Sequence, residues 1–260
     1  MNIDLEKIVR IAEDAGKAIL EVYNRDFDVR EKEDRSPLTE ADLAAHKLIV
    51  AALEGLDPKL PVLSEESAEI PYEERSRWLR YWLVDPLDGT REFIKRNGEF
   101  TVNIALIESG RPTCGVVHMP VNKVTYFGCV GKGAQKRTDQ GTANIRVDKQ
   151  RRDTTRVVGS RSHAGDSLQR FLDKLGAHEM LSMGSSLKLC LVAEGAADIY
   201  PRLGPTSEWD TGAAQAVVEA AGGKVTGLDM QPLRYNTKDS LLNPHFLVFA
   251  DQREDWSRYL

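Results

Sequence analysis

Cysteine is scarce in this sequence. The chain has three cysteines, Cys114, Cys129 and Cys190, which lie far apart within apolar segments. An odd number of cysteines at irregular spacing predicts neither a disulfide framework nor a zinc site. We therefore expect three buried, unreactive thiols and a protein of the reducing cytoplasm.

Long hydrophobic runs are also absent. No uncharged apolar stretch reaches the ~18 residues that a membrane-spanning helix needs. Charged side chains interrupt the N-terminal segment 1–16, which a signal peptide does not tolerate. We predict a chain without an integral membrane segment, and leave open a peripheral attachment to the inner face of the membrane.

The third feature that the sequence lacks is an excess of positive charge. The formal net charge is −5 and the isoelectric point is about 5.7. Binding a long polyanion normally needs a basic field, so nucleic acid is not an expected partner. A small anion can still bind where metal ions and backbone N–H groups supply a local positive potential.

The first part of the chain, residues 1–150, has the pattern of an α+β lobe. Apolar residues at helical spacing predict helices over 4–23 and from Thr39 through Leu53. Turn signals at 109–112 and 131–133 separate short apolar runs, as in antiparallel hairpins. The predicted strands are 62–63, 81–84, 102–107, 116–121 and 124–129.

The second part, residues 151–260, alternates strands and helices in an α/β pattern. The predicted strands are 156–159, 179–183, 198–200, 224–226 and 246–250, and the predicted helices are 167–175, 185–194 and 211–221. At 260 residues the chain is long enough for a single catalytic unit in which the α+β lobe joins the α/β lobe.

The segment Asp85-Pro86-Leu87-Asp88-Gly89-Thr90 directly follows the predicted strand 81–84. Two carboxylates three residues apart at the end of a strand can converge on one point, which suits a hard cation. Gly89 lets the backbone turn, and Thr90 opens a short helix whose N–H groups can face a phosphate. An ordinary turn is the alternative, because Asp-Pro and Asp-Gly pairs are common in turns.

Further acidic residues lie at predicted junctions of strands and helices, where ligand sites of α/β proteins form. Ser64-Glu65-Glu66-Ser67 follows the strand 62–63, and Glu208-Trp209-Asp210 precedes the helix 211–221. Taken singly, the glutamates are explained as solvated acids and Asp210 as an N-cap. Thr39-Glu40-Ala41-Asp42 matches a capping box, which is likewise the simple explanation of Asp42.

Together these segments resemble the signatures of the inositol monophosphatase superfamily. The resemblance rests on the segment 85–90 and on Trp209-Asp210-Thr211-Gly212-Ala213-Ala214. It extends in order from the segment 39–42 through Leu63-Ser64-Glu65-Glu66-Ser67 to the C-terminal helix, and four ordered blocks argue against chance. It implies the layered α-β-α-β-α sugar-phosphatase fold.

Within that superfamily the chain is most similar to the 3'(2'),5'-bisphosphate nucleotidases of CysQ type. Three segments carry this similarity: Asp88-Gly89-Thr90-Arg91-Glu92-Phe93-Ile94, Gly184-Ser185-Ser186-Leu187-Lys188-Leu189-Cys190 and Tyr200-Pro201-Arg202-Leu203-Gly204-Pro205-Thr206. That family usually carries lysine at position 91. Here Arg91 keeps the charge but not the shape of the side chain.

The resemblance implies a metal centre with two or three Mg²⁺ ions. Asp85 would bridge two ions, and Asp210 would complete the second site from the other lobe. Mg²⁺ prefers such an oxygen-only ligand set, and the family resemblance further implies inhibition by Li⁺. The implied ligands are Glu65, Asp85, the carbonyl of Leu87, Asp88 and Asp210.

The implied reaction is in-line attack of an activated water on the phosphorus of a phosphate monoester. Asp42 would hydrogen-bond Thr90, and these two catalytic residues would orient and deprotonate the water. A haloacid-dehalogenase phosphatase is not expected. Its two aspartates are two positions apart, whereas Asp85 and Asp88 are three apart.

The implied substrate is a nucleoside bisphosphate, 3'-phosphoadenosine 5'-phosphate, hydrolysed to AMP and phosphate. Its second phosphate needs a cation beyond the metals, and Arg202, Lys188 and His163 are candidates. Each of them can also be a surface or loop residue. The residues expected to contact the substrate are Glu65, Leu87, Asp88, Gly89, Thr90, Ser160, His163, Ser186, Lys188, Arg202 and Asp210.

Two other functions stay open. An inositol monophosphatase or a sugar bisphosphatase would use the same chemistry, and a non-catalytic metabolite-binding protein would belong to a different class. The presence of Asp42 and Thr90, which a binding protein would not need, favours an enzyme. The oligomeric state is also open, a homodimer included.

Overall fold

The computed structural model describes residues 3–31, 37–160 and 165–260. The helices are α1 (Leu5–Tyr23), α2 (Glu40–Leu56), η1 (Glu65–Ser67), α3 (Tyr72–Arg75), α4 (Thr90–Ile94), α5 (Asp166–Leu175), α6 (Leu187–Ala193), α7 (Glu208–Ala220) and η2 (Trp256–Tyr259). The strands are β1 (Val29–Glu31), β2 (Pro37–Thr39), β3 (Val62–Ser64), β4 (Arg80–Asp88), β5 (Thr101–Glu108), β6 (Arg111–Met119), β7 (Val124–Cys129), β8 (Gly133–Thr138), β9 (Gly141–Ile145), β10 (Thr155–Ser160), β11 (His178–Met183), β12 (Ile199–Arg202), β13 (Lys224–Gly227) and β14 (Phe246–Phe249).

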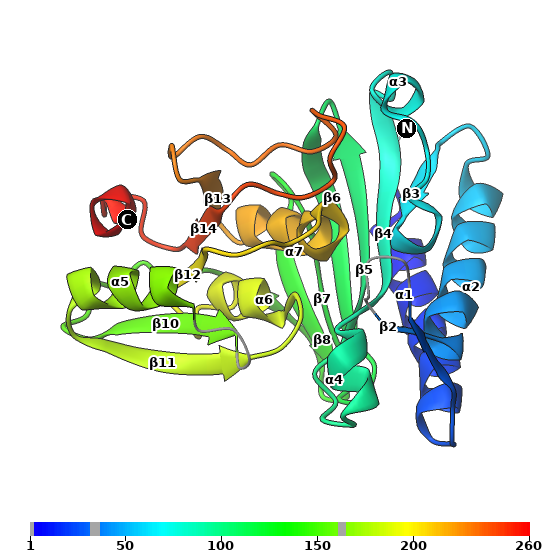
Figure 1. Ribbon diagram of the computed structural model, residues 1–260, viewed down its shortest axis with the longest axis horizontal. Coiled ribbons are helices and arrows are strands. Elements are labelled where there is room, and N and C mark those ends of the chain that lie inside the picture. The colour runs from blue at the N-terminus through cyan, green and yellow to red at the C-terminus, as the bar shows by residue number, and fades with distance from the viewer. Residues whose placement is uncertain (1–2, 32–36, 161–164) are drawn as a thin grey trace.

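Helices and sheets alternate in layers (Figure 1). From right to left in that view, α1 and α2 cover a seven-stranded sheet, and α6 and α7 separate it from a five-stranded sheet. Helix α5 and the C-terminal turn cover the outer face of the smaller sheet. This α-β-α-β-α order confirms the predicted fold class.

The larger sheet has the order β3-β4-β5-β6-β7-β8-β9, in which β3 and β4 are parallel and the other neighbours are antiparallel. Strand β4 shows why the sheet forms. Trp82 and Val84 face the core beneath α1 and α2, whereas Tyr81 and Leu83 face the core beneath α7. Because side chains alternate with period two and both faces are covered, the strand is a continuous apolar run.

The smaller sheet has the order β11-β10-β12-β14-β13, with β10 parallel to both of its neighbours. On β10, Val158 belongs to the central core with α6 and α7, and Val157 belongs to the outer core with α5. Helix α7 comes from the second part of the sequence but packs against the larger sheet. Residues of both predicted lobes therefore share one central core.

The cysteines do not behave as the sequence predicts. Cys114 on β6 and Cys129 on β7 are directly paired across the two strands and form a disulfide, with their Cα atoms 4.1 Å apart. The expectation of three free thiols is therefore wrong for these two, because the hairpin register that juxtaposes them cannot be read from their spacing. Cys190 is a buried free thiol, as predicted, and burial raises its pKa.

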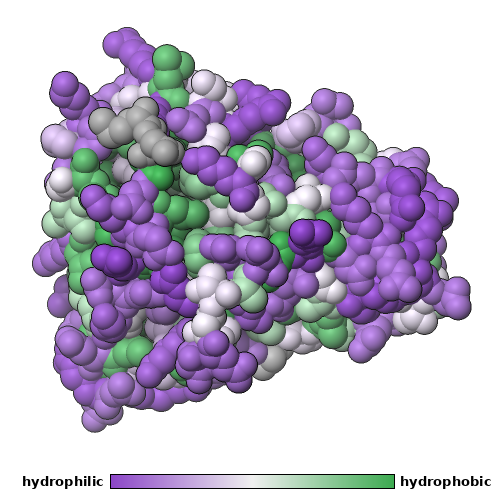
Figure 2. Space-filling view, turned by 180° about the vertical axis from the view of Figure 1, so that it is seen from behind, coloured by the Kyte–Doolittle hydropathy of each residue, from purple (hydrophilic) through white to green (hydrophobic). Residues whose placement is uncertain are grey.

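Polar and apolar side chains are unevenly spread over the surface. Figure 2 shows hydrophilic residues dominating the end that carries the smaller sheet, while hydrophobic patches show through mainly over the half with the larger sheet and its helices. Within the described residues, no helix combines the length and the apolar character that crossing a membrane requires.

Candidate metal and phosphate site

Strand β4 continues beyond residue 84, where the sequence predicts its end, and carries two carboxylates of the site. Asp85 pairs with Asn103 of β5 and Asp88 pairs with Thr101, so a step of three residues on β4 matches a step of two on β5. In a regular strand a step of three places side chains on opposite faces. The bulge cancels that offset and lets both carboxylates face the same region.

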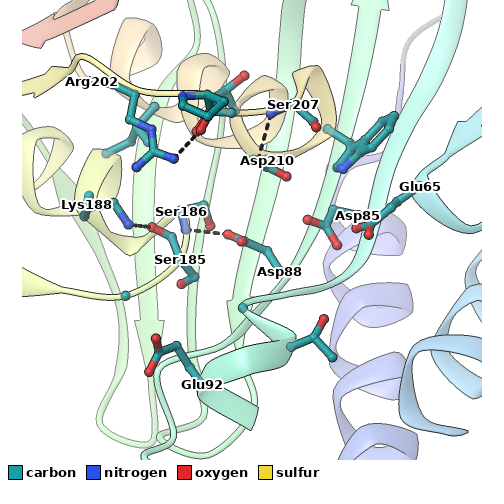
Figure 3. A pocket seen from close by; sticks show the side chains of 18 of the residues that line it. Glu65, Asp85, Asp88, Glu92, Ser185, Ser186, Lys188, Arg202, Ser207 and Asp210 are labelled. Carbon is teal, nitrogen blue, oxygen red and sulfur yellow. Dashed lines mark hydrogen bonds between the residues drawn. The ribbon is translucent and has the colours of Figure 1, made fainter. Parts of the chain in front are cut away.

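The third carboxylate comes from helix α7. This helix begins at Glu208, three residues earlier than predicted, because Ser207 and Asp210 form a capping box in which the Ser207 N–H donates to the Asp210 carboxylate at 2.9 Å. Asp210 is thus the third helical residue and not the N-cap. Carboxylate oxygens of Asp85, Asp88 and Asp210 lie within 4.8 Å of one another, and Figure 3 shows the three side chains converging.

Asp85 is buried, and Asp88 and Asp210 are half-buried close to it, which disfavours the charged forms of all three. Burial, followed by repulsion from Glu65, raises the pKa of Asp85 well above its ordinary value. Burial, followed by repulsion from Asp88, does the same to the pKa of Asp210. Burial also raises the pKa of Asp88, although the nearby Lys188 opposes this rise. A cation among the three groups would remove the repulsion.

One oxygen of Asp85 shows directly that these residues fit a metal ion. Its Oδ1 accepts the N–H of Leu87 at 3.0 Å. Its Oδ2 is buried and has no hydrogen-bond partner in the described part of the chain. Buried polar atoms are normally satisfied by protein, water or an ion. An unsatisfied carboxylate oxygen beside two further carboxylates fits a hard divalent cation such as Mg²⁺.

Glu65 and Leu87, the other predicted ligands, also line this region. Glu65 begins η1 directly after β3, and in Figure 3 its carboxylate lies beside that of Asp85. The carbonyl oxygen of Leu87 lies 3.3 Å from the hydroxyl oxygen of Thr90. Their positions suit a ligand set built from oxygen alone, and their roles as ligands stay predictions.

Asp42 combines the two roles that the sequence offered as alternatives. Its Oδ2 accepts the N–H and the hydroxyl of Thr39 at 2.8 and 2.6 Å, which completes the capping box of α2. Its Oδ1 accepts the hydroxyl of Thr90 at 3.1 Å. Thr90 begins α4 behind Gly89, whose φ of 93° lies in the left-handed region that favours glycine. The cap therefore orients the carboxylate that contacts Thr90.

The other side of the site carries two cationic residues. Lys188 on α6 is buried, which lowers its pKa to about 8, and its ammonium donates to the carbonyl of Ser185 at 2.5 Å. Arg202 ends β12 and donates to the carbonyl of Pro205 at 2.5 Å, while its buried Nε has no hydrogen-bond partner among the described residues. In Figure 3 both cations lie across from the Asp85 carboxylate.

A single pocket of about 440 Å³ brings these groups together. Asp42 is connected to it through Thr90. His163 and the side chain of Ser160 lie outside the described residues, so the structure does not place these two predicted contacts. The predicted residues that line the pocket are Glu65, Asp85, Leu87, Asp88, Gly89, Thr90, Ser186, Lys188, Arg202 and Asp210.

Comparison with known proteins identifies the family. Residues 4–255 match the model of the inositol monophosphatase family. The chain belongs to the inositol monophosphatase family. It is 50% identical over 248 residues to the 3'(2'),5'-bisphosphate nucleotidase CysQ of Salmonella typhimurium strain LT2, an alignment that covers 94% of this chain and 98% of that relative.

Solved structures share the fold. CysQ from Bacteroides thetaiotaomicron is 42% identical, with a TM-score of 0.84 over 96% of this chain and 97% of that chain. The extragenic suppressor protein suhB from Bartonella henselae is 26% identical, with a TM-score of 0.80 over 98% and 96% of the two chains. The layered architecture is therefore that of the inositol monophosphatase family.

Sequence reasoning missed a polar cluster behind Asp88. Thr101 and Asn103 are 0% and 1% exposed on β5, and they hydrogen-bond the hydroxyl of Ser186, which is itself buried. The available signal was an asparagine inside the apolar run 102–107, where a buried amide needs partners. Ser186 was predicted as a substrate contact. Its hydroxyl is engaged in this cluster, and the substrate role stays a prediction.

Proposed function

We propose that the protein is a Mg²⁺-dependent 3'(2'),5'-bisphosphate nucleotidase that hydrolyses the 3'-phosphate of 3'-phosphoadenosine 5'-phosphate to give AMP and phosphate. One observation supports it above all: a single pocket has converging carboxylates on one side and the cations Lys188 and Arg202 on the other. The names of the CysQ relatives agree with this activity.

The metal site of this proposal is formed by Asp85, Asp88 and Asp210, with Glu65 and the carbonyl of Leu87 as further ligands. When bound there, Mg²⁺ would offset negative charge on the phosphate and lower the pKa of water. The three closely spaced carboxylates repel one another when charged, so a bound cation would be favoured over three unpaired charges.

Thr90 and Asp42 would orient the attacking water and take up its proton. The Thr90 hydroxyl donates to Asp42 Oδ1, so its oxygen lone pairs can accept a hydrogen from a water in the pocket. The proton can then pass through Thr90 Oγ1 to Asp42 Oδ1. Because Thr39 holds the other oxygen of Asp42, the accepting oxygen keeps its orientation.

The phosphate that is not cleaved would lie against Arg202 and Lys188. Arg202 lines the pocket, and a guanidinium matches phosphate in a bidentate manner. The ammonium of Lys188 is next to a backbone carbonyl and has further donors. A monophosphate has no second charged group for these cations, so this side of the pocket favours a bisphosphate.

A panel of phosphate monoesters tests the proposal. The purified protein is assayed with Mg²⁺ for phosphate release from 3'-phosphoadenosine 5'-phosphate, inositol 1-phosphate and fructose 1,6-bisphosphate, with AMP identified as the product of the first. We expect the nucleoside bisphosphate to have the highest kcat/KM. Preference for the inositol ester or the sugar bisphosphate would reassign the substrate, and no turnover of any ester would overturn the enzymatic proposal.

Three finer points belong to the same proposal. We expect two or three Mg²⁺ ions per site, inhibition by Li⁺ and a cytoplasmic location, and the oligomeric state stays open, a homodimer included. The Cys114–Cys129 disulfide removes the argument for a reducing compartment that rested on free thiols. The location therefore rests on the proposed substrate alone, and a determination of the thiol content of protein purified from cells would test it.

A further inference from the structure

Asp88 uses one of its two oxygens for contacts with protein. Its Oδ2 accepts the backbone N–H of Ser186 at 2.5 Å and lies 3.4 Å from both the amide nitrogen of Asn103 and the hydroxyl of Thr101. The first bond is short and strong, and the other two are long. The orientation of this carboxylate therefore depends on where Ser186 is held.

A chain of hydrogen bonds fixes Ser186. Its hydroxyl donates to the amide oxygen of Asn103 at 2.9 Å and lies 2.9 Å from the hydroxyl of Thr101, which can donate to it. Since the Asn103 oxygen receives a hydroxyl, its NH2 group must point toward Asp88. With each hydroxyl donating once, Ser186 donates to Asn103 and Thr101 donates to Ser186, so Thr101 acts on Asp88 through Ser186.

This cluster connects the two parts of the chain at a turn whose backbone conformation is energetically unfavourable. Ser185, directly before Ser186, has a φ of 45°, which is costly for a residue with a side chain. The turn is held on both sides, because the N–H of Gly184 donates to Glu99 at 2.8 Å and that of Ser186 donates to Asp88. The position of Asp88 is thus coupled to the start of α6.

We propose that Thr101, Asn103 and Ser186 are positioning residues that hold Oδ2 of Asp88, so that its other oxygen is presented to the cation. This inference rests on the Mg²⁺ site of the proposed function. None of the three needs to touch the ion or the substrate. They act through Asp88, in the way that partners of metal ligands commonly set ligand orientation and affinity.

Mg²⁺ titration calorimetry without nucleotide tests this proposal. Thr101→Val and Asn103→Leu remove the hydrogen-bonding groups while keeping the size of the side chains. We expect each to raise the dissociation constant for Mg²⁺ by ~10-fold or more. Thr101→Ser keeps the hydroxyl and should retain wild-type affinity. If Asn103→Leu fails to fold, Ser186→Ala, which keeps the backbone bond to Asp88, tests the cluster with a smaller expected loss.

Thr125→Val is the matched control. Thr125 is a buried threonine of the same sheet whose hydroxyl is bonded to the ring of His118 at 2.9 Å, away from the pocket. This variant should lose stability with Mg²⁺ affinity unchanged. Wild-type affinity in folded Thr101→Val and Asn103→Leu would show that the cluster only stabilises the fold, and would overturn the inference.

Calorimetry also separates this inference from the proposed substrate. If wild-type protein binds Mg²⁺ but releases no phosphate from 3'-phosphoadenosine 5'-phosphate, the proposed activity fails while the variants still report on Asp88. If the wild type hydrolyses the nucleotide and the variants keep its Mg²⁺ affinity, the activity stands and the positioning role fails.

Discussion

Arg202 is the residue on which the choice between a bisphosphate and a monophosphate depends. It lines the pocket with an unpartnered buried Nε. We expect Arg202→Ala to raise KM for 3'-phosphoadenosine 5'-phosphate by ~10- to 100-fold, because a charge-assisted bidentate contact contributes ~1.5–3 kcal/mol. KM for inositol 1-phosphate should change little. Steady-state kinetics on both substrates, with Arg202→Lys as a variant that keeps the charge, would check this, and equal losses on both would contradict it.

Thr90 is a residue whose removal should separate catalysis from metal binding. We expect Thr90→Ala to lower kcat by ~10²-fold or more, since the water loses the group that orients it and passes its proton to Asp42. Thr90→Ser should restore much of the rate. Calorimetric Mg²⁺ affinity should stay near the wild-type value in both variants. A wild-type kcat in Thr90→Ala would exclude the proposed role.

At the scale of secondary structure, helices α1 and α2 were predictable because an apolar face is a local signal, to which α2 adds its capping box. The polar hairpin of β8 and β9 was missed, since residues 141–144 are exposed and show no alternation. The bulge in β4 and the Cys114–Cys129 pair depend on register with neighbouring strands. The acidic residues of the site could be named because of their motifs. Their closeness to Asn103 could not be predicted from the motifs, because it depends on how the strands pair in the sheet.

The contact between α1 and β6 predicts a pH-dependent stability. Gly16 lets the helix approach His118 closely, since a Cβ there would come within 2.6 Å of its ring. Burial lowers the pKa of His118 to about 4, from 6.5. The unfolded chain therefore takes up this proton first, and stability is lost as the pH falls from 6.5 to 4, by at most about 3 kcal/mol.

Urea denaturation at pH 7 and pH 4.5 measures this effect. We expect wild-type protein to lose more stability between these pH values than His118→Gln, whose side chain is polar but does not titrate. Titratable groups that both proteins share contribute equally to the two stability changes, so their effects cancel in the difference. Parallel losses in the two proteins would show that His118 is not the cause.

Arg75 connects α3 to the loop that leads into β14. It is 2% exposed and donates to the side chain of Asn236 and to the carbonyls of Lys238 and Asp239. Asn236 in turn donates its N–H to Glu208 at the start of α7. Removing one charged donor thus leaves several buried acceptors unsatisfied.

We expect Arg75→Met to lower the free energy of unfolding by roughly 3 kcal/mol, because hydrogen bonds to a buried charge are the costly ones to lose. Arg258→Ala is the control, since its side chain is 59% exposed and pairs with Glu254, four residues earlier. That surface pair should contribute less than about 1 kcal/mol. Equal losses in chemical denaturation would contradict the role of Arg75 as a buried anchor.

For the molecule as a whole, the carboxylate site joins segments that are far apart in sequence. Asp85 and Asp88 lie on the larger sheet, whereas Asp210 comes from the helix that also contributes to the central core. Repulsion among the three carboxylates opposes the packing that brings them together. A bound cation replaces this repulsion with attraction. The protein should therefore be less stable in EDTA than in Mg²⁺, and activity should disappear in EDTA and return with Mg²⁺.

Asp85→Asn distinguishes repulsion from ordinary packing. In EDTA we expect this variant to melt ~2–4 °C higher than the wild type, since removing a buried, unsatisfied charge stabilises the chain by ~1 kcal/mol. The retained amide oxygen can still accept the N–H of Leu87. In Mg²⁺ at ~100 times its dissociation constant the order of melting temperatures should reverse, because the wild type gains ~2.7 kcal/mol that the variant cannot.

Thermal melts of both proteins in the two buffers measure this reversal. A variant that is less stable than the wild type in EDTA would mean that Asp85 stabilises the fold without a cation, and the same melting temperature for wild-type protein in both buffers would argue against the metal site.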